Sequence, residues 1–525
     1  MSDLLPSPTL IDRVVSYVSP ERGVRRVQAR AALQIYERSG YVAARRESTE
    51  LQEWAPEARG ADEDLLPGIG ALRGRSRDAA RNQPLGAGAI GTLVTGVVGS
   101  GLAASPAIDR ERLQLSEAAA DQWESRARSL WEAYWEGTDA DLERERTGYE
   151  LQALALRSSL ESGDVLSLQR FRSSPSRRSG LASSIQLIEA DRIVSPIGDE
   201  SDGWTAGVRT DADGVVQAYG IADRVRTTLT GDQIVEGEWR EVPAYGEDGE
   251  RIARLLYGAL RPGQRRGIPW LAPVILPLRQ LDRYARAEQM AALVASMFTV
   301  FVRSASGSPL EGTGLPGIDD GRPGLGGVDD RQLRLGHGLV TELLEGEEIE
   351  IADPKRPNAA FGEFVLSGLQ QIGAALELPH EVVLKAFSRS YSASRGALLE
   401  AWRLFRVRRQ WMASHFCAPA YEAAITEAVA RGILYAPGFF EDRTVRRAYL
   451  GVQWAGDSMP SLDPQKEVAA AERRIEAEIS TRERESLELT GSSWSDNVRQ
   501  RAKEERTRRD KGLADPDPWG RGAQW

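Results

Sequence analysis

The longest unbroken helical pattern of the chain lies near its middle. Prolines at 269, 273 and 277 exclude a regular helix interior before it, because proline has no N–H and clashes with the preceding turn. No such breaker follows between Leu278 and Arg303, a stretch that would be about 39 Å long as a helix. Its first half carries charges at helical spacing, whereas positions 291–302 carry none. The pattern predicts one long helix, partly solvated at one end and packed on protein at the other. The charged positions are Arg279, Asp282, Arg283 and Arg286.

The spacing of apolar residues changes from helical to alternating at Gly163. Helical spacing with tryptophan anchors covers Ser116 to Arg146, with an expected break at Gly137. A second helix is predicted from Leu151 to Ser162, closed by Gly163. Short apolar or alternating runs, separated by Gly, Asp and Pro, then continue to residue 260. We therefore predict a module of antiparallel strands over residues 163–260, covered by the earlier helices.

An insertion separates the long central helix from the next helical pattern. Residues 304–331 are rich in Gly, Pro, Asp and Ser, which predicts a loop. Alternation over 338–351 around a Glu-Gly turn predicts a hairpin. Its carboxylates either form a solvated edge or repel a polyanion that passes nearby. A second helix is predicted from Phe361 to Leu378, ended by Pro379. The hairpin carboxylates include Glu342, Glu345, Glu347 and Glu348.

A polar segment with small and basic residues, 387–397, leads into the last long helical pattern. That pattern runs from Ala397 to Val429, with an expected kink at Pro419. Four arginines lie on it, and they either form a solvated face or meet phosphate groups. These arginines are Arg403, Arg406, Arg408 and Arg409.

The two ends of the chain are polar and highly charged. The polar, charged composition of residues 1–60 predicts a partly ordered, solvated arm. Pro464 has the position of a first-turn proline, and charged helices are predicted over 469–488 and 497–509. Residues 515–525 are expected to be disordered.

The stretch between Arg81 and Asp109 contains no charged residue, so a membrane span has to be weighed. Its residues are mostly Gly, Ala, Ser and Thr, and no aromatic residue flanks it. Glycine at this density lowers helix propensity and indicates close contact between backbones. We therefore predict a buried helix and turn here.

Composition and charge narrow the class of protein. A chain of 525 residues exceeds one ordinary core, which favours two to four domains. With 41% hydrophobic and 27% charged residues it has the composition of a soluble globular protein. A net charge of −10 argues against a protein that binds nucleic acid over its whole surface, but it is compatible with local basic patches. The single cysteine, Cys417, allows no internal disulfide and favours a reducing compartment. The N-terminus has no signal-peptide pattern.

Motifs for catalysis are missing from the sequence. There is no GxxxxGK[ST] phosphate loop and no GxSxG, HExxH or CxxC. The three histidines lie far apart and have no metal-ligand spacing. We therefore expect that the protein is not an enzyme and that it has no catalytic residue, no metal site and no cofactor.

Several segments, taken in order, resemble one family, the lambda-type bacteriophage portal proteins. The similarity spans about residues 70–490, and its individual motifs are short. They are RNQPLGAGAI at 81–90 with VVGSGL at 97–102, RPGQRRGIPWLAP at 261–273, LDRY at 281–284, YSASR at 391–395 and LDPQKE at 462–467.

The resemblance implies an α+β portal fold, mainly helical, with a wing, a two-helix stem, a clip insertion and a helical crown. Mapped by motif order, an N-terminal arm covers 1–60, and the wing, of helices plus the β-rich module, covers 61–268. The first stem helix covers 269–303, the clip 304–358 and the second stem helix 359–380. A channel-proximal loop and wing helices cover 381–454, the crown 455–510 and a disordered tail 511–525. Two long helices that flank a glycine-rich insertion fit this plan independently.

The resemblance also implies a function and partners. The expected assembly is a homo-oligomeric ring, usually of twelve subunits, at one vertex of the capsid. Double-stranded DNA enters through its channel, driven by the terminase large subunit, and leaves by the same route. Head–tail adaptor proteins and the major capsid protein or scaffold are further expected partners. The expected location is the virion, and the host cytoplasm during assembly.

The mapped site residues fall into three groups. Candidates for the DNA channel are Arg389, Ser392, Ser394 and Arg395. Candidates for contact of the clip with terminase or adaptor are Glu342, Glu345, Glu347 and Glu348. Stem candidates are Arg279, Asp282, Arg283 and Arg286.

Two other classes of protein compete with this interpretation. One is a membrane-associated scaffold anchored by residues 85–104, which sedimentation with membranes would reveal. The other is a DNA-processing enzyme, against which the missing metal and nucleotide motifs count.

Overall fold

The computed structural model describes residues 11, 15, 17–22, 24–26, 57–176, 178–196, 203–227, 233–296, 300–304, 347–351, 361–387, 390–459, 464–492 and 494–513. Residues 1–64 and 65–525 form two separate compact units. In the first unit, most of the described positions between 11 and 26 are helical. The last residue of helix α3 (Ala61–Leu65) is the first residue of the second unit, and the fold described below is that of the second unit.

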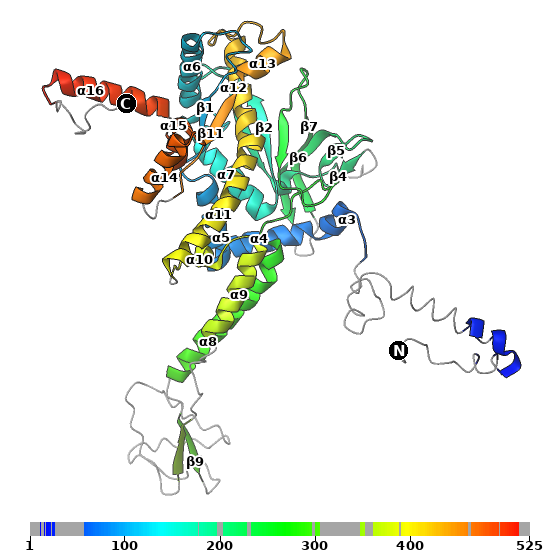
Figure 1. The fold of residues 1–525 in the computed structure, drawn as a ribbon. Helices are drawn as coiled ribbons and strands as arrows, with labels where there is room; N and C mark the ends of the chain where they lie inside the picture. Colours follow the sequence, from blue (N-terminus) through cyan, green and yellow to red (C-terminus); the bar gives the residue numbers. More distant parts are fainter. Residues whose placement is uncertain are drawn as a thin grey trace, which may run out of the picture. The chain divides into compact units, whose positions relative to one another are not determined.

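Helices make up most of this unit (Figure 1). Before the strand-rich region lie η3 (Leu66–Gly68), α4 (Ile69–Asn82), α5 (Pro84–Val97), α6 (Glu117–Trp135) and α7 (Gly148–Ser162). Within and after it lie η4 (Ala190–Arg192), η5 (Ala272–Val274), α8 (Ile275–Ser296), α9 (Phe361–Ala375), α10 (His380–Leu384), α11 (Tyr391–Met412), the π-helical turn η6 (Ala413–Cys417), α12 (Ala418–Ala430) and α13 (Arg443–Tyr449). The C-terminal helices are α14 (Pro464–Glu476), α15 (Arg482–Thr490) and α16 (Trp494–Asp510).

The described strands form four antiparallel sheets. The strands are β1 (Ala103–Pro106), β2 (Val165–Phe171), β3 (Ser183–Glu189), β4 (Trp204–Thr205), β5 (Val208–Thr210), β6 (Val216–Thr227), β7 (Gln233–Pro243), β8 (Ala253–Leu256), β9 (Val300–Ser304), β10 (Glu347–Ile351) and β11 (Val452–Ala455). Their order is β3-β2-β8 in a three-stranded sheet and β4-β5-β6-β7 in a four-stranded sheet. The pairs β1-β11 and β9-β10 form two-stranded sheets. The predicted β-rich module over 163–260 is thus confirmed, with strands from Val165 to Leu256.

Helix α5 lies inside the helical core. Its Ile90 and Leu93 side chains are fully buried, and the helix contacts α4, α7, α10 and α11. The prediction of a buried helix in the uncharged stretch is confirmed, because protein surrounds this helix. Within the described part of the chain, no helix is both long and apolar enough to cross a membrane.

Aromatic side chains from α6, α12 and β11 fill the centre of the larger of the two hydrophobic cores that the described residues form. Trp131 stacks on Trp135 with ring centroids 4.4 Å apart, and Tyr421 meets Trp131 edge-on at 5.3 Å. Trp454 approaches the same ring at 6.0 Å, so β11 is anchored on α6. A smaller core, which includes Tyr219, lies within the β-rich module. The tryptophans of 116–146 are core residues, as their spacing predicts.

The long central helix is shorter than the sequence pattern predicts. Helix α8 ends at Ser296, and Val300–Ser304 form strand β9, so the prediction of a helix to Arg303 is wrong. Strand β9 pairs antiparallel with β10, with Glu347 opposite Ser304 and Ile351 opposite Val300. Valine and phenylalanine favour strands, and here a partner strand more than forty residues away along the chain decides the structure. The expected first strand of the 338–351 hairpin lies outside the described residues.

The segment expected as a loop before the last long helix is itself helical from Tyr391. Ser390 caps α11, since its side-chain hydroxyl accepts a hydrogen bond from the Ala393 N–H at 3.4 Å. A serine at this position satisfies a free N–H of the first turn and so fixes the helix start. The predicted irregularity near Pro419 corresponds to η6, a π-helical turn directly before α12. Such turns accommodate a local break in the hydrogen-bond ladder.

Candidate functional site

Helices α8 and α9 pack against each other and are joined through the β9–β10 insertion (Figure 1). Tyr284 meets Phe364 edge-on, with ring centroids 4.9 Å apart, and also contacts Phe361. One turn earlier on α8, Leu281 approaches Gly368, further along α9. The two helices are therefore antiparallel, with the insertion between the end of α8 and the start of α9.

The four candidate residues on α8 form a local charge cluster. Asp282 accepts a hydrogen bond from the Arg286 Nε at 3.1 Å, and its other oxygen lies 4.0 Å from Arg279. The Asp282 side chain is 17% exposed, whereas those of Arg279 and Arg286 are 57% and 69% exposed. Arg283 is exposed as well. The helix thus presents a surface with more positive than negative charge, and Asp282 orients two of its three arginines.

The described channel candidates lie in the first turns of α11. Ser392 is exposed, and Ser394 and Arg395 are half-buried. Arg395 lines a groove of about 530 Å³ between α11 and α14, together with Trp402 and Arg406. Arg389 lies outside the described residues. The structure therefore brings Arg395 next to the C-terminal helices, which the sequence motifs do not indicate.

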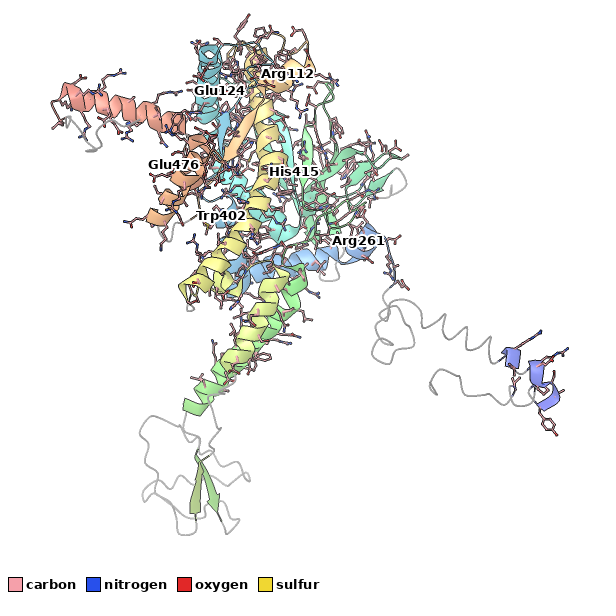
Figure 2. The ribbon with its side chains drawn as sticks, in the orientation of Figure 1. Arg112, Glu124, Arg261, Trp402, His415 and Glu476 are labelled. Atoms are coloured by element: carbon pink, nitrogen blue, oxygen red, sulfur yellow. The ribbon has the colours of Figure 1, made fainter. Side chains whose placement is uncertain are left out.

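One arginine of α11 is structural. Arg409 donates from Nε to the Val97 carbonyl at 3.1 Å and from Nη2 to the Gly96 carbonyl at 3.2 Å, at the end of α5. Its Nη1 donates to the Asp457 carbonyl at 3.0 Å, and its guanidinium lies over the ring of Trp402, which Figure 2 labels. A cation at a helix C-terminus satisfies free carbonyls and the helix dipole. Arg409 is thus engaged with protein, whereas Arg403 forms an exposed pair with Glu400.

The candidate carboxylates of the insertion are only partly described. Glu347 and Glu348 belong to β10, where their Cα partners on β9 are Ser304 and Arg303. Glu342 and Glu345 lie outside the described residues.

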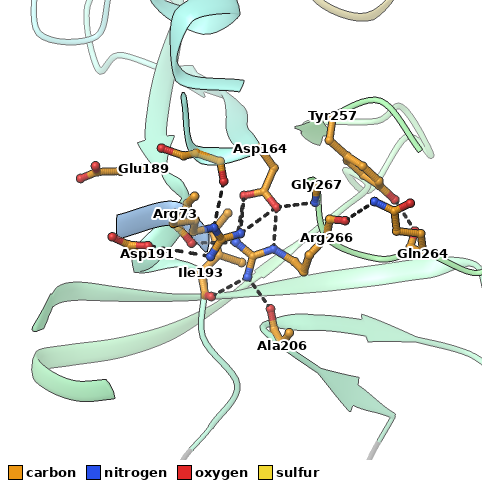
Figure 3. A network of polar contacts seen from close by, with 12 residues as sticks. Arg73, Asp164, Glu189, Asp191, Ile193, Ala206, Tyr257, Gln264, Arg266 and Gly267 are labelled. Carbon is orange, nitrogen blue, oxygen red and sulfur yellow. Dashed lines mark hydrogen bonds and ion pairs between the residues drawn. The ribbon is translucent and has the colours of Figure 1, made fainter. Parts of the chain in front are cut away.

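A buried charge network fixes the segment that leads into α8 (Figure 3). Asp164, between α7 and β2, accepts from Arg266 at 2.8 and 2.9 Å and from the Gly267 N–H at 2.8 Å. Arg73 on α4 donates to both oxygens of the same carboxylate, at 3.1 and 3.0 Å. Arg266 also reaches three carbonyls of the β-rich module, those of Ala190, Ile193 and Ala206. The network therefore joins α4, the β-rich module and the approach to α8.

Electrostatics keep this network ionised. Burial by itself would raise the pKa of Asp164, but the charges of Arg266 and Arg73, with the Gly267 N–H, hold it below its usual range. Burial and the neighbouring Arg266 lower the pKa of Arg73 to about 10, which leaves it charged at neutral pH. Every acceptor position of the carboxylate is occupied by a donor. The network therefore cross-links these segments through a charged Asp164 and a charged Arg73 near neutral pH.

Two glycines allow this cross-link to close. Gly163 ends α7 with a φ of 91°, and its backbone contacts that of Gly267. A Cβ on Gly267 would lie 1.9 Å from the Gly163 carbonyl oxygen, too close for any other residue. The sequence reasoning missed this contact. A charged residue between a helix-ending glycine and an apolar strand, as in Gly163-Asp164-Val165, could have singled out Asp164, though not its partners.

Comparisons with known proteins give one consistent family. The family model described as phage portal protein, lambda family, matches residues 47–409, more than half of the chain. The chain is 24% identical over 493 residues to the portal protein of Escherichia phage N15, covering 90% of this chain and 91% of that protein. It is also 24% identical over 484 residues to portal protein B of Escherichia phage lambda, covering 89% of each. A chain in the virion of a native gene transfer agent particle aligns over 76% of this chain and 94% of that chain, with 15% identity. The TM-score of this alignment is 0.39, which is too low to add to the family assignment.

The extended match places the chain among proteins that build phage particles. It belongs to the lambda family of phage portal proteins.

Proposed function

We propose that this chain is the subunit of a portal ring at one capsid vertex, through which DNA is packaged and later ejected. The observation that carries the proposal is the family match over residues 47–409, which includes α8, α9 and the insertion between them. In such a ring, one surface of each subunit contacts a different surface of the next subunit, and the same contact repeats until the ring closes. Twelve subunits are the expected number.

Within this ring, α8 and α9 form the stem and the β9–β10 insertion forms the clip. Residues 61–268 form the wing, and α14, α15 and α16 form the crown. The clip, with Glu347 and Glu348, is the part that meets the terminase large subunit and, later, the head–tail adaptor. The wing or crown meets the capsid protein or scaffold. The chain acts as a structural part of the virion, assembled in the host cytoplasm, and catalyses no reaction.

The first turn of α11 is the part we assign to the channel. Ser392, Ser394 and Arg395, with Arg389 just before them, offer small polar groups and two positive charges. DNA moves past such a surface because few phosphates are neutralised at once, whereas many contacts would arrest it. The net charge of −10 for the chain favours the same behaviour.

Genetic complementation tests the proposal. A phage that lacks this gene should assemble heads without DNA, and the wild-type chain supplied in trans should restore packaged DNA, measured as nuclease-resistant genome. Normal DNA content in heads that lack the chain would overturn the proposed function.

A further inference from the structure

A cavity of about 340 Å³ lies between α12 and one face of the β3-β2-β8 sheet. Residues 167, 169 and 171 of β2 share that face, because alternate side chains of a strand point to the same side. Alanines 420, 423 and 430 of α12 line the opposite wall, and their small side chains leave the space between helix and sheet open. His415, labelled in Figure 2, also lines the cavity. The volume is that of an ordinary ligand site.

Polar donors without partners converge on this cavity from three elements. Arg254 of β8 makes no hydrogen bond and no ion pair with any residue that the structure describes, and its Nε is buried. The Nε2 of Gln169 on β2 is likewise buried without an acceptor among the described residues. Arg446 of α13 donates to Glu250 at 2.7 Å and to Thr426 at 3.3 Å, but its buried Nε has no partner in the described part of the chain. Buried donors are normally bonded to protein or to ordered water, so these three are available to water or to a ligand in the cavity.

Apolar side chains form part of the cavity wall. Ile185 and Ile252 line the sheet side, and Phe416 and Pro419 line the helix side. Burial lowers the pKa of Arg254, with a further contribution from Arg251, yet a guanidinium keeps its charge in proteins. The other two arginines of the lining have partners, since Arg251 donates to the Ala253 carbonyl and the Tyr219 hydroxyl, and Arg446 to Glu250 and Thr426. Arg254, which is half-buried, is therefore the lining arginine without a partner among the described residues.

Four carboxylates line the cavity, and three of them accept hydrogen bonds from protein donors. Glu250 accepts from Arg446, Asp248 from the Glu250 N–H, and Glu427 from Arg431 and the Ala182 and Ser183 N–H groups. The fourth, Glu422 of α12, makes no hydrogen bond within the described residues, so its charge is the one that most directly opposes an incoming anion. Burial, and then the nearby Glu250, raise its pKa. Glu422 and Arg254 are not within ion-pair distance of each other, so neither neutralises the other directly.

We propose that this cavity binds a carboxylate carried by an apolar group, with Arg254 as the anchor and Gln169 and Arg446 as further donors. Arginine pairs with carboxylates through two parallel hydrogen bonds, which fits a side chain whose donors are unused. The carboxylate belongs either to a free organic acid or to the C-terminal end of a peptide. The chemistry is the same in both cases.

The first experiment measures binding of 3-phenylpropanoate to the full chain by calorimetry, with 3-phenylpropanamide and 2-phenylethylamine as matched uncharged and cationic probes. The acid should bind at least tenfold more tightly than either probe. Arg254→Gln should remove this preference, because the anchor is lost. Arg403→Gln, the same change at an exposed arginine on α11, should leave it intact. Equal binding of acid and amide, or binding that Arg254→Gln leaves unchanged, would overturn the proposal.

A second variant tests whether the acid binds beside Glu422. Glu422→Gln removes a repelling charge from the cavity and should tighten binding of the acid. Unchanged or weaker binding would show that the acid does not occupy this cavity, and the proposal fails. Ala423→Leu fills the cavity from the helix side and should abolish binding independently of charge.

The two sources of carboxylate are compared with N-acetyl-Ala-Phe, which has a free C-terminus, and with its C-terminal amide. Tighter binding of this peptide acid than of 3-phenylpropanoate supports the site and assigns it to a protein terminus. Weaker binding of the peptide, with 3-phenylpropanoate retained, supports the site and assigns it to a free acid. Binding of neither acid overturns it.

Discussion

Replacing Asp164 with asparagine tests the buried charge network directly. The carboxylate accepts hydrogen bonds from Arg73, Arg266 and the Gly267 N–H, and its side chain is fully buried. The side chains of the two arginines are only 2% and 3% exposed. An asparagine side chain at this position would keep the volume but remove the charge, and its amide N–H groups would face other donors. Among the described residues, the only carboxylate left in ion-pair contact with Arg73 would be Asp191, at the longer distance of 3.8 Å, and Arg266 would keep only backbone carbonyls as partners.

The expected cost follows from this geometry. Removing one partner of a buried ion pair destabilises a protein by about 3–5 kcal/mol, because the remaining charge stays desolvated. No cavity contributes, since asparagine has nearly the same shape. We therefore expect Asp164→Asn to lower the free energy of unfolding by about 3–5 kcal/mol, seen as a lower urea midpoint at an unchanged m value.

The pH dependence gives an independent check on Asp164. A carboxyl whose folded pKa is depressed stabilises the protein above its unfolded pKa, about 3.9, and loses this contribution as pH falls through the folded value. The difference between wild type and Asp164→Asn should therefore be constant from about pH 8 to about pH 5. Asp121→Asn, on the exposed surface of α6, should stay within about 0.5 kcal/mol of wild type. A loss for Asp164→Asn below about 1 kcal/mol at neutral pH would refute the reasoning.

Three further predictions concern other parts of the chain. Gly267→Ala should reduce stability by more than about 2 kcal/mol in urea unfolding, because its Cβ meets backbone at 1.9 Å, whereas Gly258→Ala, whose nearest atom is 3.6 Å away, should be tolerated. Glu485, whose pKa an arginine partner lowers to about 2, should stabilise the C-terminal helices above about pH 4.5 and lose this effect toward pH 2. The difference in the free energy of unfolding between wild type and Glu485→Gln should therefore shrink as the pH falls over that range. A difference that stays constant would contradict this prediction. Changing Arg389 and Arg395 together to Glu should leave the ring intact by electron microscopy but reduce nuclease-resistant DNA in heads, and normal packaging would remove both from the channel.

Local sequence patterns predict those helices and strands whose positions are determined by residues close by in the chain. The helix before Gly163 ends where a glycine with positive φ allows it, and Thr147 with Glu150 forms a capping box at its start. The strand-rich module follows from alternation within short runs. The start of α14 at Pro464 follows from the fixed φ of proline, which suits a first turn.

Contacts between distant parts of the chain could not be predicted in this way. Residues 300–304 have no helix breaker before them, and only their pairing with 347–351 makes them a strand. Asp164 and Arg266 are separated by 102 residues, so nothing near either one indicates the other. Arg409 looks like its neighbours Arg406 and Arg408 in sequence, and only the position of α5 makes it a cap.

The central claim is that the chain forms a ring with an axial channel. Electron microscopy of the purified, full-length protein tests it most directly. We predict closed annular particles, with a central opening wide enough for double-stranded DNA and about twelve subunits around it. Monomers or dimers alone, under all conditions and also in the presence of capsid and scaffold proteins, would contradict the account.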